Sequence, residues 1–278
     1  MSTPQTPPRA LTIAGSDSGG GAGLEADLRT FTACRVHGCV AVTAVTVQNS
    51  VGVTAVHEIP ADVVAAQIEA VVTDIGVGAA KTGMLASTEI IRVVAAACDR
   101  VGIGRTRAVP FVVDPVAASM HGDPLLHDDA LEAIRTELFP RATVVTPNLD
   151  EVRLLVGLEV PDRTAQYGAA QALHALGPQY VLVKGGHLRA DTDRVVDLLY
   201  DGTTFTELSG PRFDTPHTHG GGDTLASAIT SALARGASVP DAVAFGKRYV
   251  ELAVQHAYPL GAGVGPVSPF WRIRPDPV

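Results

Sequence analysis

The chain has 278 residues, of which 46% are hydrophobic, and it carries a net charge of −8. A chain of this length and hydrophobicity can bury a full core, which excludes intrinsic disorder. The acidic balance, without a cluster of Lys and Arg, argues against nucleic acid as a partner, and no apolar run is long enough to cross a membrane.

The first nine residues, MSTPQTPPR, are rich in proline and lack the apolar segment of a secretion signal, so we expect a flexible tail at 1–9. Three cysteines, Cys34, Cys39 and Cys98, are too few for a disulfide framework. Cys34 and Cys39 have no second pair of ligands at zinc-binding spacing, and we interpret them as small core residues. Reduced thiols are typical of a cytoplasmic protein, and we expect that location.

Short apolar runs then alternate with longer amphipathic segments. The apolar runs predict strands at 10–14, 39–47, 108–114, 142–146 and 180–186. Helical spacing predicts helices from about residue 24, at 61–75, at about 223–235 and at 239–257. The runs 194–200 and 203–208, parted by Asp201-Gly202, are typical of a hairpin.

This alternation predicts a fold of the α/β class, a mostly parallel sheet with helices on both faces. The hairpin would add a small antiparallel piece at one edge. No internal repeat or low-complexity linker divides the chain, so residues 10–278 are expected to form a single three-layer α/β/α domain. Ligands of such sheets bind beyond the carboxyl ends of the strands. Polar residues gather at these predicted ends, in GSD (15–17), QN (48–49), KTGM (81–84), DPV (114–116), TPNLDE (146–151) and KGGH (184–187).

The turn after the first predicted strand, GSDSGGGAGLEAD (15–27), contains the G-x-G-x-x-A pattern of a dinucleotide-binding loop. An NAD-linked enzyme also needs an acidic residue at the end of the second strand, to bind the ribose hydroxyls. That strand ends in Val47-Gln48-Asn49, and no Asp or Glu occurs between Asp27 and Glu58. We therefore favour a substrate-binding loop, with a turn made only for helix–sheet packing as the alternative.

The stretch HTHGGGDTLASAI (217–229) places Gly220, Gly221 and Gly222 directly before Asp223 and a predicted helix. Glycines at a helix start let backbone N–H groups converge on an anion, and the helix dipole adds positive potential there. The aspartate can serve as a helix cap. It can also accept a proton from an attacking hydroxyl while the amides hold a phosphoryl group. Because no P-loop sequence occurs, the pattern predicts phosphoryl transfer to an alcohol without a Walker loop.

Nine segments between residues 10 and 267 follow one another in the order found in a known enzyme family. They are AGSDSGGGAG (14–23), TAVTVQNSVGV (43–53), AAKTGML (79–85), VVDPV (112–116), GDPLL (122–126), VVTPNLDE (144–151), VLVKGGHL (181–188), THGGGDTLASAI (218–229) and LGAGVGP (260–266). Together they resemble the hydroxymethylpyrimidine/phosphomethylpyrimidine kinases of thiamine biosynthesis. Many members of that family have a cysteine in a GTGC run where this chain has Asp223, and the Asp form is similar to the wider ribokinase-like superfamily.

The resemblance implies a ribokinase-like domain that uses ATP and Mg²⁺. It would phosphorylate 4-amino-5-hydroxymethyl-2-methylpyrimidine and then its monophosphate. Pyridoxal kinase of the same superfamily is the nearest alternative, because it also phosphorylates a hydroxymethyl group on a nitrogen heteroaromatic ring. A catalytically silent pyrimidine-binding module is a further alternative, against which the intact GGGD argues. The family tends to form homodimers, so a homodimer is expected here.

The resemblance also implies roles for particular residues. Substrate-binding residues would be Gly15, Asp17, Gly21, Gln48 and Met84. Catalytic residues would be Lys184, Gly220, Gly221, Gly222 and the base Asp223. ATP would contact Asn148, Lys184, Gly222 and Thr224, and Mg²⁺ would be held by Asp114 and Glu151, partly through water.

Two of these roles have support from residue chemistry. The Gln48 amide offers a donor and an acceptor to an aminopyrimidine edge, and the spacing of Asn148 and Glu151 also predicts a capping box. Four histidines, His121, His187, His217 and His219, fall in the predicted loops. We expect them to be polar lining or hydrogen-bonding groups and not metal ligands.

Overall fold

The computed structural model describes residues 6–117, 129–186, 188 and 193–273. The segment GDPLL at 122–126, His121, His187 and the first five residues of the expected tail lie outside these ranges.

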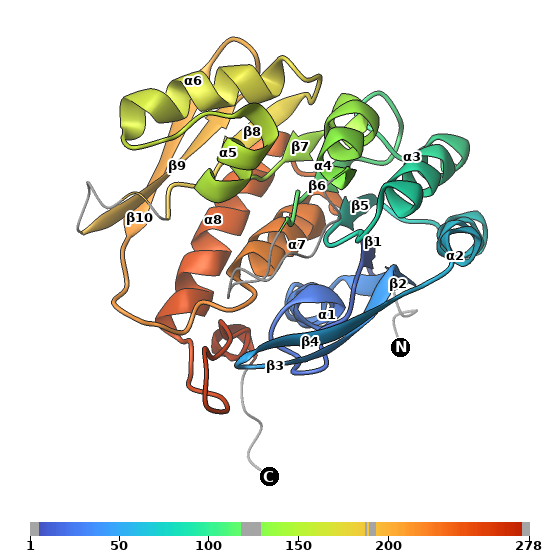
Figure 1. The fold of residues 1–278 in the computed structure, drawn as a ribbon, viewed down its shortest axis with the longest axis horizontal. Helices are drawn as coiled ribbons and strands as arrows, with labels where there is room; N and C mark the ends of the chain where they lie inside the picture. Colours follow the sequence, from blue (N-terminus) through green and yellow to red (C-terminus); the bar gives the residue numbers. More distant parts are fainter. Residues whose placement is uncertain (1–5, 118–128, 187, 189–192, 274–278) are drawn as a thin grey trace, which may run out of the picture.

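An eight-stranded sheet forms the centre of the molecule (Figure 1). Its order is β10-β9-β8-β7-β6-β5-β1-β2. The bounds of these strands are Arg9–Ala14 (β1), His37–Val42 (β2), Ala79–Thr82 (β5), Phe111–Val113 (β6), Val144–Val145 (β7), Tyr180–Val183 (β8), Arg194–Tyr200 (β9) and Phe205–Pro211 (β10). All pairings from β2 to β8 are parallel, whereas β9 runs antiparallel to both β8 and β10. The predicted parallel sheet with an antiparallel edge hairpin is confirmed.

Helices cover both faces of this sheet (Figure 1). One face carries α1 (Gly23–Ala33), α7 (Gly221–Leu233) and α8 (Val239–Gln255). The other carries α2 (Ala61–Asp74), α3 (Thr88–Val101), α4 (Ala130–Ala133), α5 (Leu149–Val156) and α6 (Arg163–His174). A π-helical turn at Ile134–Leu138 and 3₁₀ turns at Phe139–Arg141 and Phe270–Arg272 complete the helical part. No helix in the described ranges combines the length and the hydrophobicity needed to span a bilayer.

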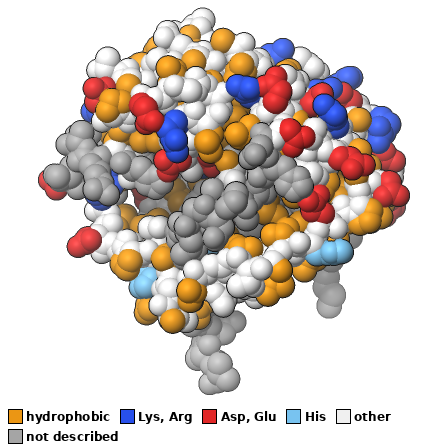
Figure 2. All heavy atoms as spheres, in the orientation of Figure 1, with side chains coloured by type: hydrophobic (Ala, Val, Ile, Leu, Met, Phe, Trp, Pro, Cys, Tyr) orange, Lys and Arg blue, Asp and Glu red, His pale blue; other side chains and the backbone are white. Residues whose placement is uncertain are grey.

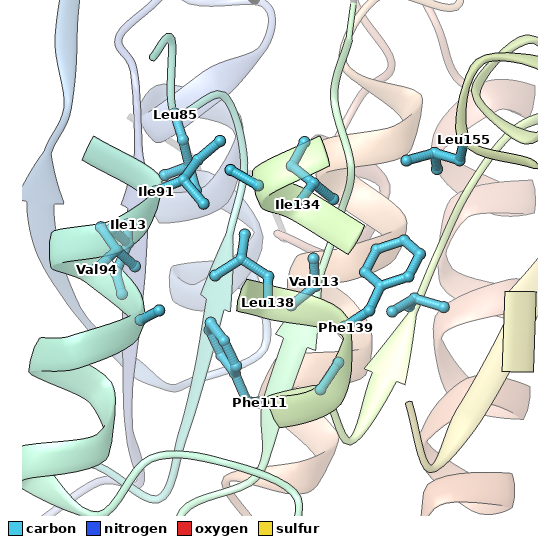
Figure 3. Close-up of a cluster of buried hydrophobic side chains, with 14 of the residues drawn as sticks. Ile13, Leu85, Ile91, Val94, Phe111, Val113, Ile134, Leu138, Phe139 and Leu155 are labelled. Carbon is cyan, nitrogen blue, oxygen red and sulfur yellow. The ribbon is translucent and has the colours of Figure 1, made fainter. Parts of the chain in front are cut away.

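The central strands β1, β5, β6, β7 and β8 are mostly apolar because both of their faces are buried. In β6, Phe111 and Val113 point into the cluster beneath α3 and α4, whereas Val112 points into the cluster beneath α7. Figure 3 shows the first cluster, in which Ile91 and Val94 of α3 lie against the strand residues. The predicted core positions Cys34 and Cys39 are buried, as is Cys98.

The predicted strand 39–47 is wrong in one respect, because it is two strands in two sheets. β2 ends at Val42. The next strand, β3 (Ala44–Asn49), pairs with β4 (Gly52–Glu58) in a separate antiparallel ribbon. The sequence did not predict β4. Thr43 marks the turn: its N–H donates to the Ala14 carbonyl at 2.9 Å and its hydroxyl donates to the Met84 carbonyl at 2.7 Å. A run of β-branched residues predicts extended backbone but does not identify the strand that pairs with it.

Candidate active site

The carboxyl ends of β1, β5, β6, β7 and β8 open into one pocket of about 850 Å³. It lies where the chain order reverses, because β1 is flanked by β2 on one side and by β5 on the other. Such switch points leave a crevice between loops that diverge to opposite faces of the sheet. The space-filling view (Figure 2) shows acidic and basic side chains interspersed over the outer surface.

The pocket brings together nearly all of the predicted site residues. Its lining includes Gly15, Asp17, Gln48, Met84, Asp114, Asn148, Glu151, Lys184, Gly220, Gly221, Gly222 and Asp223. Gly21 and Thr224 do not line it: a Cβ at Gly21 would overlap the ring of His219, and Thr224 is buried within α7. Residues scattered over 200 positions of sequence therefore meet at one edge of the sheet.

The start of α7 forms the floor of the pocket. Gly220 is the N-cap, with a left-handed φ of 73°, and a Cβ there would overlap the carbonyl oxygen of Gly21. The helix begins at Gly221, two residues earlier than predicted, so Asp223 is the third helical residue and not the cap. The expectation of an Asp223 cap is thus corrected. The Gly221 N–H donates to the Thr218 carbonyl at 3.1 Å, so this one of the three glycine amides already has a partner in the chain.

The following two amides, of Gly222 and Asp223, lie in the first turn, where backbone N–H groups have no partner inside a helix. A Cβ added to Gly222 would lie 3.4 Å from Lys184 Nζ and 3.6 Å from Asp114 Oδ2. The bare backbone of the helix start therefore directly faces a lysine and a carboxylate. This arrangement suits an anion with a bound cation beside it.

Asp223 is the carboxylate in the first turn of this helix, and 16% of its side chain is exposed. Its Oδ1 lies 3.7 Å from Nζ of Lys81, a fully buried residue of β5 that pairs with Asp27 of α1 at 2.7 Å. Burial raises the pKa of Asp223 to about 6, because the effect of desolvation exceeds the lowering effect of Lys81. Burial opposes the charge of Lys81, but Asp27 and Asp223 raise its pKa above the usual value.

Sequence reasoning gave Lys81 and Asp27 no role. Two signals were present: Lys81 is a lone charge in the apolar strand AAKT, and Asp27 falls on the same helical stripe as Leu24 and Phe31. A charge at a predicted core position requires a partner.

A second charged group lies on the opposite side of Gly222. Lys184 Nζ is 3.2 Å from Asp114 Oδ1 and 3.8 Å from Glu151 Oε2. Thr146 also donates its hydroxyl to Asp114 Oδ1 at 2.8 Å. Burial alone would lower the pKa of Lys184, but the carboxylates of Asp114 and Glu151 raise it above its usual value. Lys184 is therefore a fixed positive charge in the pocket wall.

The predicted capping box at the start of α5 is confirmed. Asn148 N–H donates to Glu151 Oε2 at 2.7 Å, and Glu151 N–H donates to Asn148 Oδ1 at 2.8 Å. The pKa of Glu151 is raised to about 7, because burial outweighs the opposing effect of Lys184. The cap thus holds Glu151 with its carboxyl group toward Lys184. Within the described ranges, no three His, Cys, Asp or Glu side chains are grouped closely enough to hold a metal ion by themselves.

The Gly-rich turn after β1 is organised around Asp17. The backbone N–H groups of Gly19, Gly21 and Ala22 donate to its carboxylate at 2.8, 2.9 and 2.8 Å. His219 Nε2 lies 2.9 Å from the same group. Burial opposes the charge, but these hydrogen bonds lower the pKa of Asp17 below its usual value. Asp17 therefore shapes the turn through its carboxylate.

Gln48 reaches this turn from the end of β3. Its backbone N–H donates to Ser18 Oγ at 2.8 Å, and the Ser18 hydroxyl donates to the Gln48 carbonyl at 2.7 Å. The Gln48 amide nitrogen lies 3.5 Å from His219 Nε2. His219, expected only as a polar or hydrogen-bonding residue, thus connects the turn, Gln48 and the start of α7. Met84 lies opposite, next to Gly15, where a Cβ would fall 2.5 Å from Met84 Cε.

The far end of the pocket lies between β9, β10 and α8 and was not predicted. Val250 and Val254 of α8 and Phe213 provide apolar wall there. Lys247 lies in the same wall, 3.0 Å from Asp197 Oδ2 and 3.5 Å from Glu251 Oε1. These residues come from segments without a motif, which is why sequence reasoning missed them.

Comparison with known proteins adds evolutionary evidence. The family model for phosphomethylpyrimidine kinase matches residues 17–268. The hydroxymethylpyrimidine/phosphomethylpyrimidine kinase of Mycobacterium tuberculosis (strain ATCC 25618 / H37Rv) is 63% identical over 268 residues, which are 96% of each chain. A thiamine biosynthesis bifunctional protein of Geobacter sulfurreducens is 45% identical over 258 residues, covering 93% of this chain and 51% of that protein. The solved ADP complex of Bacillus subtilis pyridoxal kinase has a TM-score of 0.88 at 38% identity, covering 97% of this chain and 100% of that one.

Proposed function

This chain belongs to the phosphomethylpyrimidine kinase family, and we propose that its pocket transfers the γ-phosphoryl group of ATP to 4-amino-5-hydroxymethyl-2-methylpyrimidine. The enzyme is a kinase of thiamine biosynthesis, and it phosphorylates the alcohol first and the resulting monophosphate second. The observation that carries this conclusion is the meeting of Asp223, the amides of the α7 start and Lys184 in one pocket. The ADP complex of the pyridoxal kinase supports a nucleotide as the donor.

Asp223 is the proposed base of the first transfer. The hydroxymethyl oxygen forms a bond to the γ-phosphorus, its proton passes to the Asp223 carboxylate, and ADP leaves. A pKa of about 6 keeps this carboxylate mostly ionised at neutral pH while making it a stronger base than an exposed aspartate. In the second transfer the attacking phosphate oxygen is already ionised, so no base of comparable strength is required.

The transferring phosphoryl group would lie over the start of α7. The amides of Gly222 and Asp223 and the helix dipole stabilise negative charge there, and Lys184 neutralises charge from the side. Gly220 contributes by its left-handed backbone and Gly221 by leaving the approach free of a side chain. Electrostatic stabilisation of this kind is commonly the largest single contribution to phosphoryl transfer.

Asp114 and Glu151 fit Mg²⁺ as partners that act partly through water. They are oxygen donors on one side of the pocket, held by Thr146 and by the capping box. Two carboxylates without a full protein cage suit Mg²⁺, which keeps several waters and binds phosphate oxygens. Bound there, the ion would neutralise phosphate charge. Lys184 holds both carboxylates in place, and Asn148 positions Glu151 through the cap.

We assign the pyrimidine to the pocket end near Gln48. The Gln48 amide can pair with the amino group and the adjacent ring nitrogen, and Met84 covers the ring next to Gly15. Asp17 and Gly21 act indirectly, by fixing the turn that borders the ring. ATP would extend from Lys184 and Gly222 toward the apolar end at α8. Buried Thr224 supports that end only through the packing of α7.

A homodimer and a cytoplasmic location complete the proposal. The ribbon β3–β4 has an outward face of four exposed residues, Val45, Val47, Ala55 and His57. Val45 is 47% and Val47 58% exposed. Apolar residues on such a ribbon support a second copy as the occupant of this face. Three buried thiols without a disulfide support the cytoplasm.

Product analysis tests the function. Purified protein is incubated with ATP, Mg²⁺ and either the pyrimidine alcohol or pyridoxal, and the mono- and diphosphate products are counted. We expect both pyrimidine phosphates and little pyridoxal phosphate. A higher kcat/KM with pyridoxal would reassign the enzyme to pyridoxal kinase, and absence of any phosphorylated product would favour a silent binding module.

A further inference from the structure

A buried ion pair lies directly beneath the proposed base. The side chains of Lys81 in β5 and Asp27 in α1 are both fully buried, and Lys81 Nζ lies 2.7 Å from Asp27 Oδ1. Two hydroxyls hold the Asp27 carboxylate: Ser227 Oγ donates to Oδ1 and Thr12 Oγ1 donates to Oδ2, each at 2.6 Å. Residues from β1, β5, α1 and α7 therefore fix this pair.

The pair reaches the pocket through Asp223. Lys81 Nζ lies 3.7 Å from Asp223 Oδ1, and Asp223 is partly exposed whereas Lys81 and Asp27 are not. Gly83 borders this gap: a Cβ there would lie 3.7 Å from Lys81 Nζ and 3.8 Å from Asp223 Oδ1. A buried ion pair is rarely more stabilising than apolar residues of the same volume, because both charges lose their hydration. Fold stability is therefore a poor reason for placing these two charges here.

We infer that Lys81, anchored by Asp27, is a positioning residue for Asp223, an inference that rests on the catalytic role proposed for Asp223. The ammonium draws Oδ1 of Asp223 inward and keeps the carboxylate ionised, which leaves Oδ2 to take the proton of the substrate hydroxyl. Asp27 balances this effect, because it shares the ammonium charge and prevents Asp223 from becoming too weak a base. The two members of the pair thus act on Asp223 with opposite signs.

Other charged groups also face Asp223. They lie after β6, in α5 and after β8, and they are Asp114, Glu151 and Lys184. All three stay unchanged in the variants described next, so their influence is common to every comparison. Burial raises the pKa of Asp223, Lys81 lowers it and Asp27 raises it, in that order of size.

The test measures the Asp223 carboxyl group directly. The protein is labelled with ¹³C at aspartate carboxyl carbons and titrated by NMR without nucleotide or Mg²⁺, and the Asp223 signal is identified by its loss in Asp223→Asn. Lys81→Met should raise the pKa of Asp223 by about one unit or more, because an opposite charge within about 4 Å is removed. Asp27→Asn, which keeps the shape of the side chain, should lower it.

Kinetics provide a second readout. The acid limb of the pH profile for the first phosphorylation should move upward in Lys81→Met and downward in Asp27→Asn. The profile for phosphorylation of the monophosphate should not move. Ile229→Ala is the matched control, because Ile229 is a fully buried residue of the same helix α7. It should reduce thermal stability without shifting the Asp223 titration.

An unchanged pKa of Asp223, or shifts of the same sign in both variants, would overturn the inference. If the pKa moves as expected but the first-step pH profile does not, the role of Lys81 stands and the assignment of Asp223 as base fails. If Lys81→Met does not fold, the Asp27→Asn variant provides the test. A lowered pKa of Asp223 in that variant supports the inference, and an unchanged or raised pKa contradicts it.

Discussion

Asp223 shows how burial changes the chemistry of one side chain. Desolvation raises its pKa, and the ammonium of Lys81 limits that rise, with the result that the group titrates at about 6. A carboxyl group with this pKa is ionised at neutral pH yet accepts a proton more readily than an exposed aspartate. Asp17, in contrast, has its pKa lowered by hydrogen bonds from its own turn, which fits a structural role.

Replacing Asp223 by Asn should separate the two phosphorylations. We expect the rate of the first to fall by about 10²–10⁴, because the proton of the alcohol loses its acceptor, and the rate of the second to fall less. Rapid-quench measurement of both steps, with alcohol or monophosphate as substrate, gives the two rates. Equal losses would indicate electrostatic damage to the phosphate site in place of a lost base.

Although Asp223→Asn should lower the rate of phosphorylation, it should increase the stability of the fold. A raised folded-state pKa means that Asp223 favours folding at low pH, and that this contribution is lost as pH rises from about 4 to above 6. At about pH 8, Asp223→Asn should therefore unfold with a free energy ~1–2 kcal/mol higher than the parent protein. Urea titrations at about pH 8 and about pH 4.5 test this, since the difference should shrink at the lower pH. A variant that is less stable at both pH values would contradict it.

At the scale of elements, the loop–helix junctions determine the geometry of the site. Gly220 requires a left-handed backbone and close approach to Gly21, whereas Gly221 is in the ordinary helical range with only Val267 nearby, 3.9 Å from an added Cβ. The two neighbouring glycines therefore have different functions. Gly220 permits the turn, and Gly221 keeps the approach to the helix start clear.

Substitution of these two glycines should give different defects. Gly220→Ala should cost more than ~1 kcal/mol of folding stability, because it combines a left-handed φ with overlap on a carbonyl oxygen. Gly221→Val should keep the fold and block turnover, because its side chain projects where the phosphoryl group is expected. Thermal unfolding and kcat of both variants provide the comparison. Full activity in Gly221→Val would exclude this loop from phosphate binding.

An element could be predicted from the sequence when the residues that determine it are close together in the chain. The capping box of α5 is encoded by Asn148 and Glu151 alone, and the structure confirms it. The ribbon β3–β4 was missed because Thr43 leaves the main sheet through contacts with Ala14 and Met84, which are distant in sequence. The start of α7 was placed two residues late, because three glycines give no propensity signal for a helix.

At the scale of the whole molecule, strand order decides where chemistry can occur. The reversal of strand order at β1 opens the crevice, and α7, which comes late in the chain, forms its floor. Gln48 lies in the β3–β4 ribbon, so the proposed dimer through this ribbon would contact the hairpin that carries Gln48.

Introducing a charged side chain on the β3–β4 ribbon tests the proposed dimer face. Val47→Glu should convert a dimer to a monomer of about 28.8 kDa, because a charge on the apolar ribbon face must be desolvated on association. Light scattering coupled to size-exclusion chromatography measures the mass. Val63→Glu is the matched control, since Val63 of α2 is also exposed, at 44%. A dimer that persists in Val47→Glu would place the interface elsewhere, and a monomeric parent protein would refute the homodimer.

The sequence by itself determined the fold class, the family and many of the residues that line the pocket. Parallel strands end in polar residues at the same edge of a sheet, and motifs such as GGGD and TPNLDE have local physical meaning. Only the tertiary structure showed that Lys81 and Asp27 lie beneath Asp223, that Asp17 holds its own turn with His219, and that Gln48 reaches the site on a separate ribbon. These relations join residues as many as 202 positions apart in the chain. Contacts of this kind depend on packing, and no local pattern of residues encodes them.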